Sequence, residues 1–435
     1  MRLESRGVRV RPRPARLVAA ALLLAAIAGA APAVPASVAV AAPGILAADA
    51  VRDRQYWLDE YGIRAAWAVT RGAGVTIAII DSGVDATHPD LRGAVVDGID
   101  LSGVGSSDGT RPVGSDAPDH GTMVASLAAG RGSAPGDGVI GAAPEASLLS
   151  ASLAFGPEQR DGDAQVAEAV RWAVDAGADV ISLSLTRNTL SWPESWDDAF
   201  GYAEANDVVV IAAAGNRGSG TEQVGAPATI PGVVAVGGVD RRGVASDTAS
   251  AQGISIAVMA PSEQLVGAVP GGGHVIWQGT SGAAPIVAGI AALIRSAHPE
   301  ATAADVVARL IGTARPVTAT VPDPLYGYGL VDAAAAVRAD LPPVAENPLG
   351  SLAEWISLNR RADAEVRSVR VESAREAVGR AGHPGLGRIG EAVRPVVAAI
   401  APLATVGAAV LGGSLLVIAA VSIGAARFVR RARSG

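Results

Sequence analysis

Residues 75–83 read VTIAIIDSG, a short apolar and β-branched run that leads directly into Asp81-Ser82-Gly83. Such a run, without polar alternation, is typical of a strand buried on both faces of a parallel sheet. Asp81 would then lie at the carboxyl end of the strand, where such sheets form their sites, and Gly83 allows a sharp exit. An Asp in this place can also be a turn or helix-cap residue, so it establishes no function alone.

Similar β-branched runs recur farther along the chain, at 179–184, 208–212 and 233–236. Two segments, 164–176 and 301–311, place their apolar residues at helical spacing. Alternation of strands and helices through this region predicts an α/β fold, with a mostly parallel sheet and helices on both of its faces.

The composition excludes several classes of protein. The 435 residues include no Cys, which excludes disulfide scaffolds, Cys-zinc sites and thiol nucleophiles. Charged residues make up 18%, too few for a charge-driven disordered chain. The net charge of −7 is uneven: residues 1–16 carry +5 and residues 427–435 carry +4, so residues 17–426 carry −16. An acidic body argues against nucleic acid as a partner.

The N-terminal 41 residues are predicted to be a secretory signal peptide. Six Arg precede the uncharged run Leu17–Ala30, and small residues with Pro follow it. Cleavage after Ala33, Ala36 or Ala41 fits this pattern, and the alternatives are an uncleaved membrane anchor and a disordered tail. Residues 42–56 then form a short N-terminal extension, which we expect to lie along the body as an extended strap. Its contacts would come from Gln55, Tyr56, Trp57 and Leu58.

The C-terminal region is predicted to cross a membrane once. Residues 395–426 contain no charge, and their core has about the ~20 residues that a bilayer-spanning helix needs. The basic tail 427–435 follows directly, which places the C-terminus in the cytoplasm and the body outside it. Residues 341–394 are rich in Arg, Glu, Ala and Pro and are expected to be a stalk. The catalytic domain is expected to occupy residues 57–340.

Two further segments carry reactive side chains at predicted helix starts. Asp119-His120-Gly121 precedes one apolar helical run, and Gly279-Thr280-Ser281 precedes another. Backbone N–H groups at a helix start suit the stabilisation of an oxyanion, although an N-cap Ser or a structural His is the ordinary interpretation of each. Together with Asp81 the segments give the order Asp…His…Ser, which is one of the known orders of a catalytic triad.

The ordered set of motifs resembles the subtilisin-family serine peptidases (subtilases) over roughly residues 57–337. The matching segments are Asp81-Ser82-Gly83, His120-Gly121-Thr122, Gly141-Ala142-Ala143-Pro144, Ala213-Ala214-Gly215-Asn216, Ala226-Pro227-Ala228, Gly279-Thr280-Ser281 with Ala284-Pro285, and Tyr328-Gly329-Leu330-Val331-Asp332-Ala333. A subtilisin-like fold and peptide-bond hydrolysis through an acyl-enzyme are what the resemblance implies.

The resemblance also implies a role for each matched residue. Ser281 corresponds to the nucleophile, His120 to the general base, and Asp81 to the group that orients the imidazole. The amide of Asn216 would form the oxyanion hole with the Ser281 N–H. Ser184-Leu185-Thr186 resembles the strand that pairs with an extended substrate.

Three positions near the site depart from the family pattern, and one of them is Met123, which stands where a second His is common. The family usually has Gly where Thr186 stands, which leaves the shape of that subsite open. Gly282 replaces the Met that commonly follows the nucleophile, and a Gly in the first turn can weaken a helix by up to about 1 kcal/mol.

The overall layout resembles the mycosins, membrane-anchored subtilases associated with type VII secretion. The shared features are the signal peptide, the run 55–59 before the domain, the stalk, and a single C-terminal helix followed by basic residues. Mycosins usually carry cysteines, which this chain lacks. The expected partners are a protein or peptide substrate, the membrane and a type VII secretion complex. The alternative function is a structural subunit of such a complex whose peptidase activity is dispensable.

The histidines outside the triad indicate no metal site. No His pair has the spacing of metal ligands, so neither a catalytic metal nor a cofactor is expected. His88 is interpreted as a loop-stabilising residue, and His274, His298 and His383 as surface or loop residues. Structural calcium remains open, because loop oxygens can bind it without a sequence signature.

Overall fold

The computed structural model describes residues 51–114, 117–156 and 159–360. The predicted signal peptide 1–41, the membrane segment 395–426, the basic tail 427–435 and His383 therefore lie outside the described residues.

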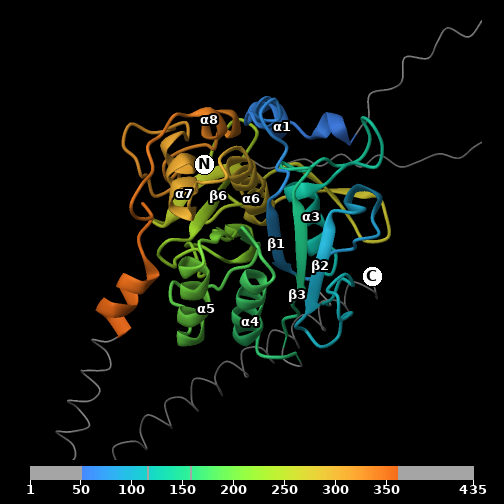
Figure 1. The fold of residues 1–435 in the computed structure, drawn as a ribbon, viewed down its shortest axis with the longest axis horizontal. Helices are drawn as coiled ribbons and strands as arrows, with labels where there is room; N and C mark the ends of the chain where they lie inside the picture. The colour runs from blue at the N-terminus through green and yellow to red at the C-terminus, as the bar shows by residue number, and fades with distance from the viewer. Residues whose placement is uncertain (1–50, 115–116, 157–158, 361–435) are drawn as a thin grey trace, which may run out of the picture. The chain divides into compact units, whose positions relative to one another are not determined.

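A seven-stranded parallel sheet forms the centre of the described fold (Figure 1). Its order is β2-β3-β1-β4-β5-β6-β7, so β1 lies between β3 and β4. The strands are β1 (Thr76–Asp81), β2 (Val95–Asp100), β3 (Ser147–Ser152), β4 (Val180–Leu183), β5 (Val209–Ala213), β6 (Val234–Val239) and β7 (Ile256–Pro261). A separate antiparallel hairpin consists of β8 (Leu265–Ala268) and β9 (His274–Trp277).

Helices cover both faces of the sheet, as the sequence predicted. One face carries α3 (His120–Ala129) and α6 (Thr280–Ala297), which pack against each other, and the other face carries α4 (Gly162–Asp175) and α5 (Glu194–Ala205). The remaining elements are α1 (Trp57–Glu60), α2 (Ile63–Ala66), α7 (Ala303–Gly312), α8 (Ala333–Arg338), and the short 3-10 helices η1 (Arg52–Arg54), η2 (Pro89–Leu91) and η3 (Arg217–Ser219).

The four predicted strands are present as β1, β4, β5 and β6, and the two predicted helices as α4 and α7. The apolar periodicity gave no sign of β3, whose sequence is SLLSAS. Its buried serines are satisfied by hydrogen bonding, since the hydroxyls of Ser150 and Ser152 both donate to the carbonyl of Gly109 at 2.7 and 3.0 Å. A polar side chain can be buried in a core when its hydrogen-bonding groups have partners.

The start of the described chain forms short helices rather than an extended strap, and its residues 55–58 are buried in the body. Residues 52–54 form η1, and α1 begins at Trp57, which is fully buried together with Leu58. Gln55 joins this segment to the body because its side-chain amide both donates to and accepts from the backbone of Ile140, at 2.7 and 3.0 Å. The expectation of an extended conformation was wrong here, while the four expected contact residues are all buried.

The body continues past residue 340, where the stalk was expected to begin. The backbone N–H of Val344 donates to Asp305, and residues 352–360 are helical. Trp355 packs against Trp192 with ring centroids 4.6 Å apart and ring planes tilted by 43°, and Arg360 pairs with Asp197 at 2.8 Å. The charged composition of residues 341–360 suggested a stalk. Their packing on the body could not be predicted, because the partners of their aromatic and Arg side chains lie far away in sequence.

Among the described helices, α6 is the one long and apolar enough to cross a membrane by length and composition, and 78% of that span is buried inside the fold. Its apolar side chains therefore fill the core between α3 and the sheet.

Candidate active site

The fold places Asp81 beside His120. Asp81 is the last residue of β1, and His120 is the first residue of α3. The imidazole Nδ1 lies 2.8 and 2.9 Å from the two carboxylate oxygens. The Asp81 side chain is 5% exposed and the His120 side chain 23%, so the carboxylate is shielded while the imidazole reaches solvent.

The start of α3 is attached to the end of β1 through Ser82. Its hydroxyl accepts from the N–H of Gly121 at 3.0 Å and donates to the carbonyl of Pro118 at 3.1 Å. A Cβ at Gly121 would come within 2.3 Å of the Gly83 carbonyl oxygen, so only glycine permits this close approach. The matched Ser-Gly and His-Gly pairs therefore fix the distance between the carboxylate and the imidazole.

The surroundings of His120 shift its pKa in opposing directions. Burial alone would lower the pKa of the imidazole, but the charge of Asp81 and the hydrogen bond to it outweigh burial and raise that pKa above its ordinary value. Asp81 therefore stabilises the protonated ring, which is the form that a general base reaches during catalysis.

Ser281 lies in the first turn of α6, after Gly279 at φ 141°. It is partly exposed, and its hydroxyl donates to the carbonyl of Ser184 at 3.3 Å. Ser184 Oγ in turn donates to the carbonyl of Ser281 at 2.9 Å. The backbone N–H of Ser281 is one of the donors that a helix start leaves without an intrahelical partner.

Asn216 lies three residues after the end of β5 and faces the same helix start. Its Oδ1 accepts from the N–H and the hydroxyl of Thr280, at 2.8 and 3.0 Å. Because these donors fix which end of the amide is the oxygen, the NH₂ group remains available to a ligand. Gly215, at φ 104°, makes the turn that brings Asn216 out of the strand, and its N–H donates to Thr280 Oγ1 at 3.1 Å.

A groove of about 490 Å³ begins at Asp81 and His120 and extends along the residues after β4. Ser184, Leu185 and Thr186 line one wall, which places the predicted substrate strand at the groove. The rest of the lining is largely apolar and includes Leu153, Phe155, Val166 and Trp196. A second cavity of about 350 Å³ lies against residues 345–354, and none of the predicted triad residues lines it.

Trp277, the last residue of β9, was not among the predicted site residues. Its ring meets that of His120 edge-on, with centroids 5.8 Å apart. Trp277 also packs near Gly282, where a Cβ would come within 2.3 Å of Leu265 and 3.3 Å of Trp277. The sequence contained an indication of this role, because Trp277 is an aromatic residue only four positions before Ser281.

Among the described residues outside the predicted triad, His88, Asp90 and His274 form a group of side chains that could hold a metal ion. His298 lies elsewhere, with Nε2 2.7 Å from the carbonyl of Val337.

Comparison with known proteins gives a consistent result. The model of the family described as "Subtilase family" matches residues 72–329. Subtilisin E of Bacillus subtilis is 38% identical over 274 residues, which are 61% of this chain and 66% of that protein. Mycosin-1 of Mycobacterium tuberculosis is 36% identical over 340 residues, which are 66% of this chain and 74% of that protein.

Solved structures show the same relationship. The crystal structure of MycP1 from Mycobacterium smegmatis aligns with a TM-score of 0.57 and 30% identity, covering 67% of this chain and 86% of that one. The MycP3 protease from the type VII (ESX-3) secretion system aligns with a TM-score of 0.55 and 34% identity, covering 65% and 88%.

Proposed function

The chain belongs to the subtilase family, and we propose that it is a membrane-anchored serine endopeptidase whose catalytic body lies outside the cytoplasm. The observation that carries the proposal is the contact of the Asp81 carboxylate with His120 Nδ1, in a fold that also presents Ser281 and the amide of Asn216 at one helix start. The raised pKa of His120 supports its role as the base.

The proposed reaction proceeds by acyl transfer. Ser281 Oγ attacks the carbonyl carbon of the scissile peptide bond while His120 Nε2 takes the hydroxyl proton. The oxyanion accepts hydrogen bonds from Asn216 Nδ2 and the Ser281 N–H. His120 then protonates the leaving amine as the C–N bond breaks. A water molecule, deprotonated by His120, hydrolyses the acyl-enzyme and regenerates Ser281.

The substrate is proposed to bind as an extended peptide along Ser184–Thr186. A strand-like segment next to a groove offers backbone hydrogen bonds without regard to sequence, and apolar pockets then select side chains. The apolar lining by Leu153, Phe155 and Trp196 favours a peptide with an apolar residue on the N-terminal side of the cut.

Membrane anchoring and an association with type VII secretion are proposed from the ends of the sequence and from the mycosin relatives. The basic-apolar pattern at residues 1–41 and the uncharged segment 395–426 with its basic tail support one exported, single-pass topology. The similarity to mycosin-1 and to proteases of type VII systems supports the association. A purely structural subunit is disfavoured, because it has no need for Asp81, His120, Asn216 and Ser281 together.

Labelling with a fluorophosphonate probe tests the peptidase assignment. Membranes containing the full chain should show one labelled band, and Ser281→Ala should abolish it. Ser191→Ala, which changes an exposed Ser in the loop before α5, serves as the matched control and should label like the parent. Labelling that survives Ser281→Ala would contradict the assignment.

A further inference from the structure

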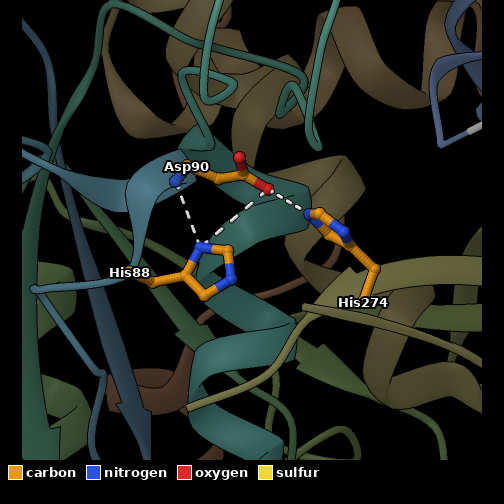
Figure 2. Close-up of side chains that lie close together, drawn as sticks. All are labelled: His88, Asp90 and His274. Carbon is orange, nitrogen blue, oxygen red and sulfur yellow. Dashed lines mark hydrogen bonds and ion pairs between the residues drawn. The ribbon is translucent and has the colours of Figure 1, made fainter. Parts of the chain in front are cut away.

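A cluster of three side chains, His88, Asp90 and His274, lies between η2 and the β8–β9 hairpin (Figure 2). One potential ligand atom from each residue lies within 4.8 Å of the others. The side chains of His88 and Asp90 are buried, while that of His274 is 21% exposed. Two imidazoles and a carboxylate, brought together from positions 184 residues apart, are the donor types found in transition-metal sites.

The ring of His88 is oriented as in a metal ligand. Its Nε2 lies 3.1 Å from the carbonyl of Gly273, which requires that this nitrogen carry the proton. The lone pair of Nδ1 then faces Asp90 and accepts a hydrogen bond from its backbone N–H at 3.1 Å, so an ion bound at Nδ1 would replace that hydrogen bond. Nδ1 lies 4.0 Å from Asp90 Oδ2. Histidines that bind metals usually donate the other ring N–H to a carbonyl or carboxylate.

The carboxylate of Asp90 lacks a permanent cationic partner. Asp90 is fully buried, and within the described part of the chain its ion-pair partners are the two histidines rather than an Arg. Its Oδ2 accepts from the N–H of Val139 at 2.8 Å and lies 2.7 Å from His274 Nε2, but its Oδ1 has no hydrogen-bond partner. A buried negative charge is costly unless a positive charge offsets it.

We propose that His88 Nδ1, Asp90 Oδ2 and His274 Nε2 bind a divalent transition-metal ion of the Zn²⁺ type. Calcium fits poorly, because it takes about 6–8 oxygen ligands. Metal bonds of ~2.0–2.2 Å require the three atoms to draw together. His274 can make that movement, since it follows the turn Gly271–Gly273 and is the exposed member of the group. Water would complete a tetrahedron on its open side.

The bound ion would fasten the hairpin to the body. Asp85 already connects the two by accepting from the N–H of Gly271 at 2.8 Å, and the metal would add a second connection through His274. The same hairpin carries Trp277 at its other end, against His120. The ion therefore has a structural role, and it takes no part in the proposed acyl transfer.

The test uses the full chain carrying Ser281→Ala, purified in detergent and freed of metal with a chelator. Titration with Co²⁺ should reach one equivalent and produce the visible absorption of a four-coordinate site. Zn²⁺ should abolish that absorption by displacement, and Ca²⁺ should not. His274→Gln should weaken Co²⁺ affinity at least about tenfold, since it removes one of three ligands.

Two control variants make the result specific. His298→Gln changes a His outside the cluster, and His120→Gln removes the imidazole of the proposed triad; both should bind Co²⁺ like the parent. His274→Gln decides the outcome, because His88 is buried and its replacement can unfold the chain. Absence of the Co²⁺ absorption, unchanged affinity in His274→Gln, or loss of binding in His120→Gln would each overturn the proposal.

Discussion

Ser184 Oγ donates a hydrogen bond of 2.9 Å to the carbonyl oxygen of Ser281. The helix cannot supply this bond itself, because residue 285 is a Pro without an N–H to reach the carbonyl four residues earlier. The loop after β4 therefore holds the backbone of the proposed nucleophile, and the same loop lines the groove. The proposed substrate binding and the placement of Ser281 therefore depend on one segment.

Ser184→Ala should lower stability by about 1–3 kcal/mol, because it leaves the Ser281 carbonyl without its donor. We expect kcat to fall more than KM changes, since the nucleophile loses its position. Pro285→Ala supplies an N–H, so the loss of stability should be smaller in that background. Urea unfolding and peptide kinetics on the four variants measure this coupling, and equal losses in both backgrounds would contradict it.

The acid limb of kcat/KM should have a midpoint above the ordinary His pKa of about 6.5, because Asp81 raises the pKa of His120. Asp81→Asn should move the limb to lower pH and reduce kcat by about 10⁴, the size of effect found for the Asp of another serine-protease triad. A pH profile of both proteins checks this, and a limb that stays in place would contradict the role of Asp81.

The raised pKa of His120 also makes the stability of the fold depend on pH. Because the folded-state pKa of His120 is raised, its contact with Asp81 stabilises the fold fully below about pH 6.5. This contribution is lost as the pH rises through the folded-state pKa. Unfolding measured across this range should therefore show the opposite pH trend to the activity, and the trend should be weaker in His120→Gln.

Gly282→Met should destabilise the chain by about 1–3 kcal/mol through overpacking. The space beside residue 282 is occupied by Leu265, which is fully buried and cannot turn into solvent. Adding Leu265→Ala should recover part of the loss by making room. Thermal unfolding of the single and double variants gives the answer, and a stabilised single variant would show that helix propensity outweighs the steric conflict.

Gln55→Ala should cost about 1–3 kcal/mol for each backbone group of Ile140 that it leaves unpaired. Arg54→Ala, one position earlier and exposed, is the matched control and should have little effect. Activity per folded molecule should stay unchanged in both. A faster peptidase rate in Gln55→Ala would instead indicate that this segment restrains the active site.

Deletion of residues 395–435 should release the body into the medium, because the proposed membrane span is removed. Fractionation of cells with an antibody against the body measures the distribution. The full chain should stay with the membranes, and so should a variant that lacks only the tail 427–435. If the truncated chain also stayed with the membranes, a second anchor would be required.

The sequence was most informative where a buried strand or an apolar helix meets a reactive residue. Asp81, His120 and Ser281 each stand at such a boundary, so their type and order could be interpreted from the sequence alone. The adjoining glycines marked close backbone approaches, as Gly121 does against Gly83. The structure brings Asp81 and His120 into contact, and the catalytic roles remain a prediction for the kinetic tests.

Contacts between distant segments could not be predicted in this way. His88 and His274 looked like unrelated loop residues, because the hairpin that brings His274 to Asp90 has no local signature in the sequence. Arg360 and Trp355 looked like parts of a charged stalk, since their partners Asp197 and Trp192 lie 163 positions away. Pairing of this kind depends on tertiary packing rather than on periodicity.

The glycine at position 282 also affects how susceptible the site is to oxidation. The nearest side-chain atoms belong to Leu265, Leu127 and Trp277, none of which contains sulfur. In relatives with Met after the nucleophile, a thioether at this position can become a larger, polar sulfoxide beside the reacting serine. In this chain residue 282 is Gly, so the position after Ser281 offers peroxide neither a thiol nor a thioether. The residue next to the proposed nucleophile is therefore a glycine, which has no side chain for peroxide to oxidise.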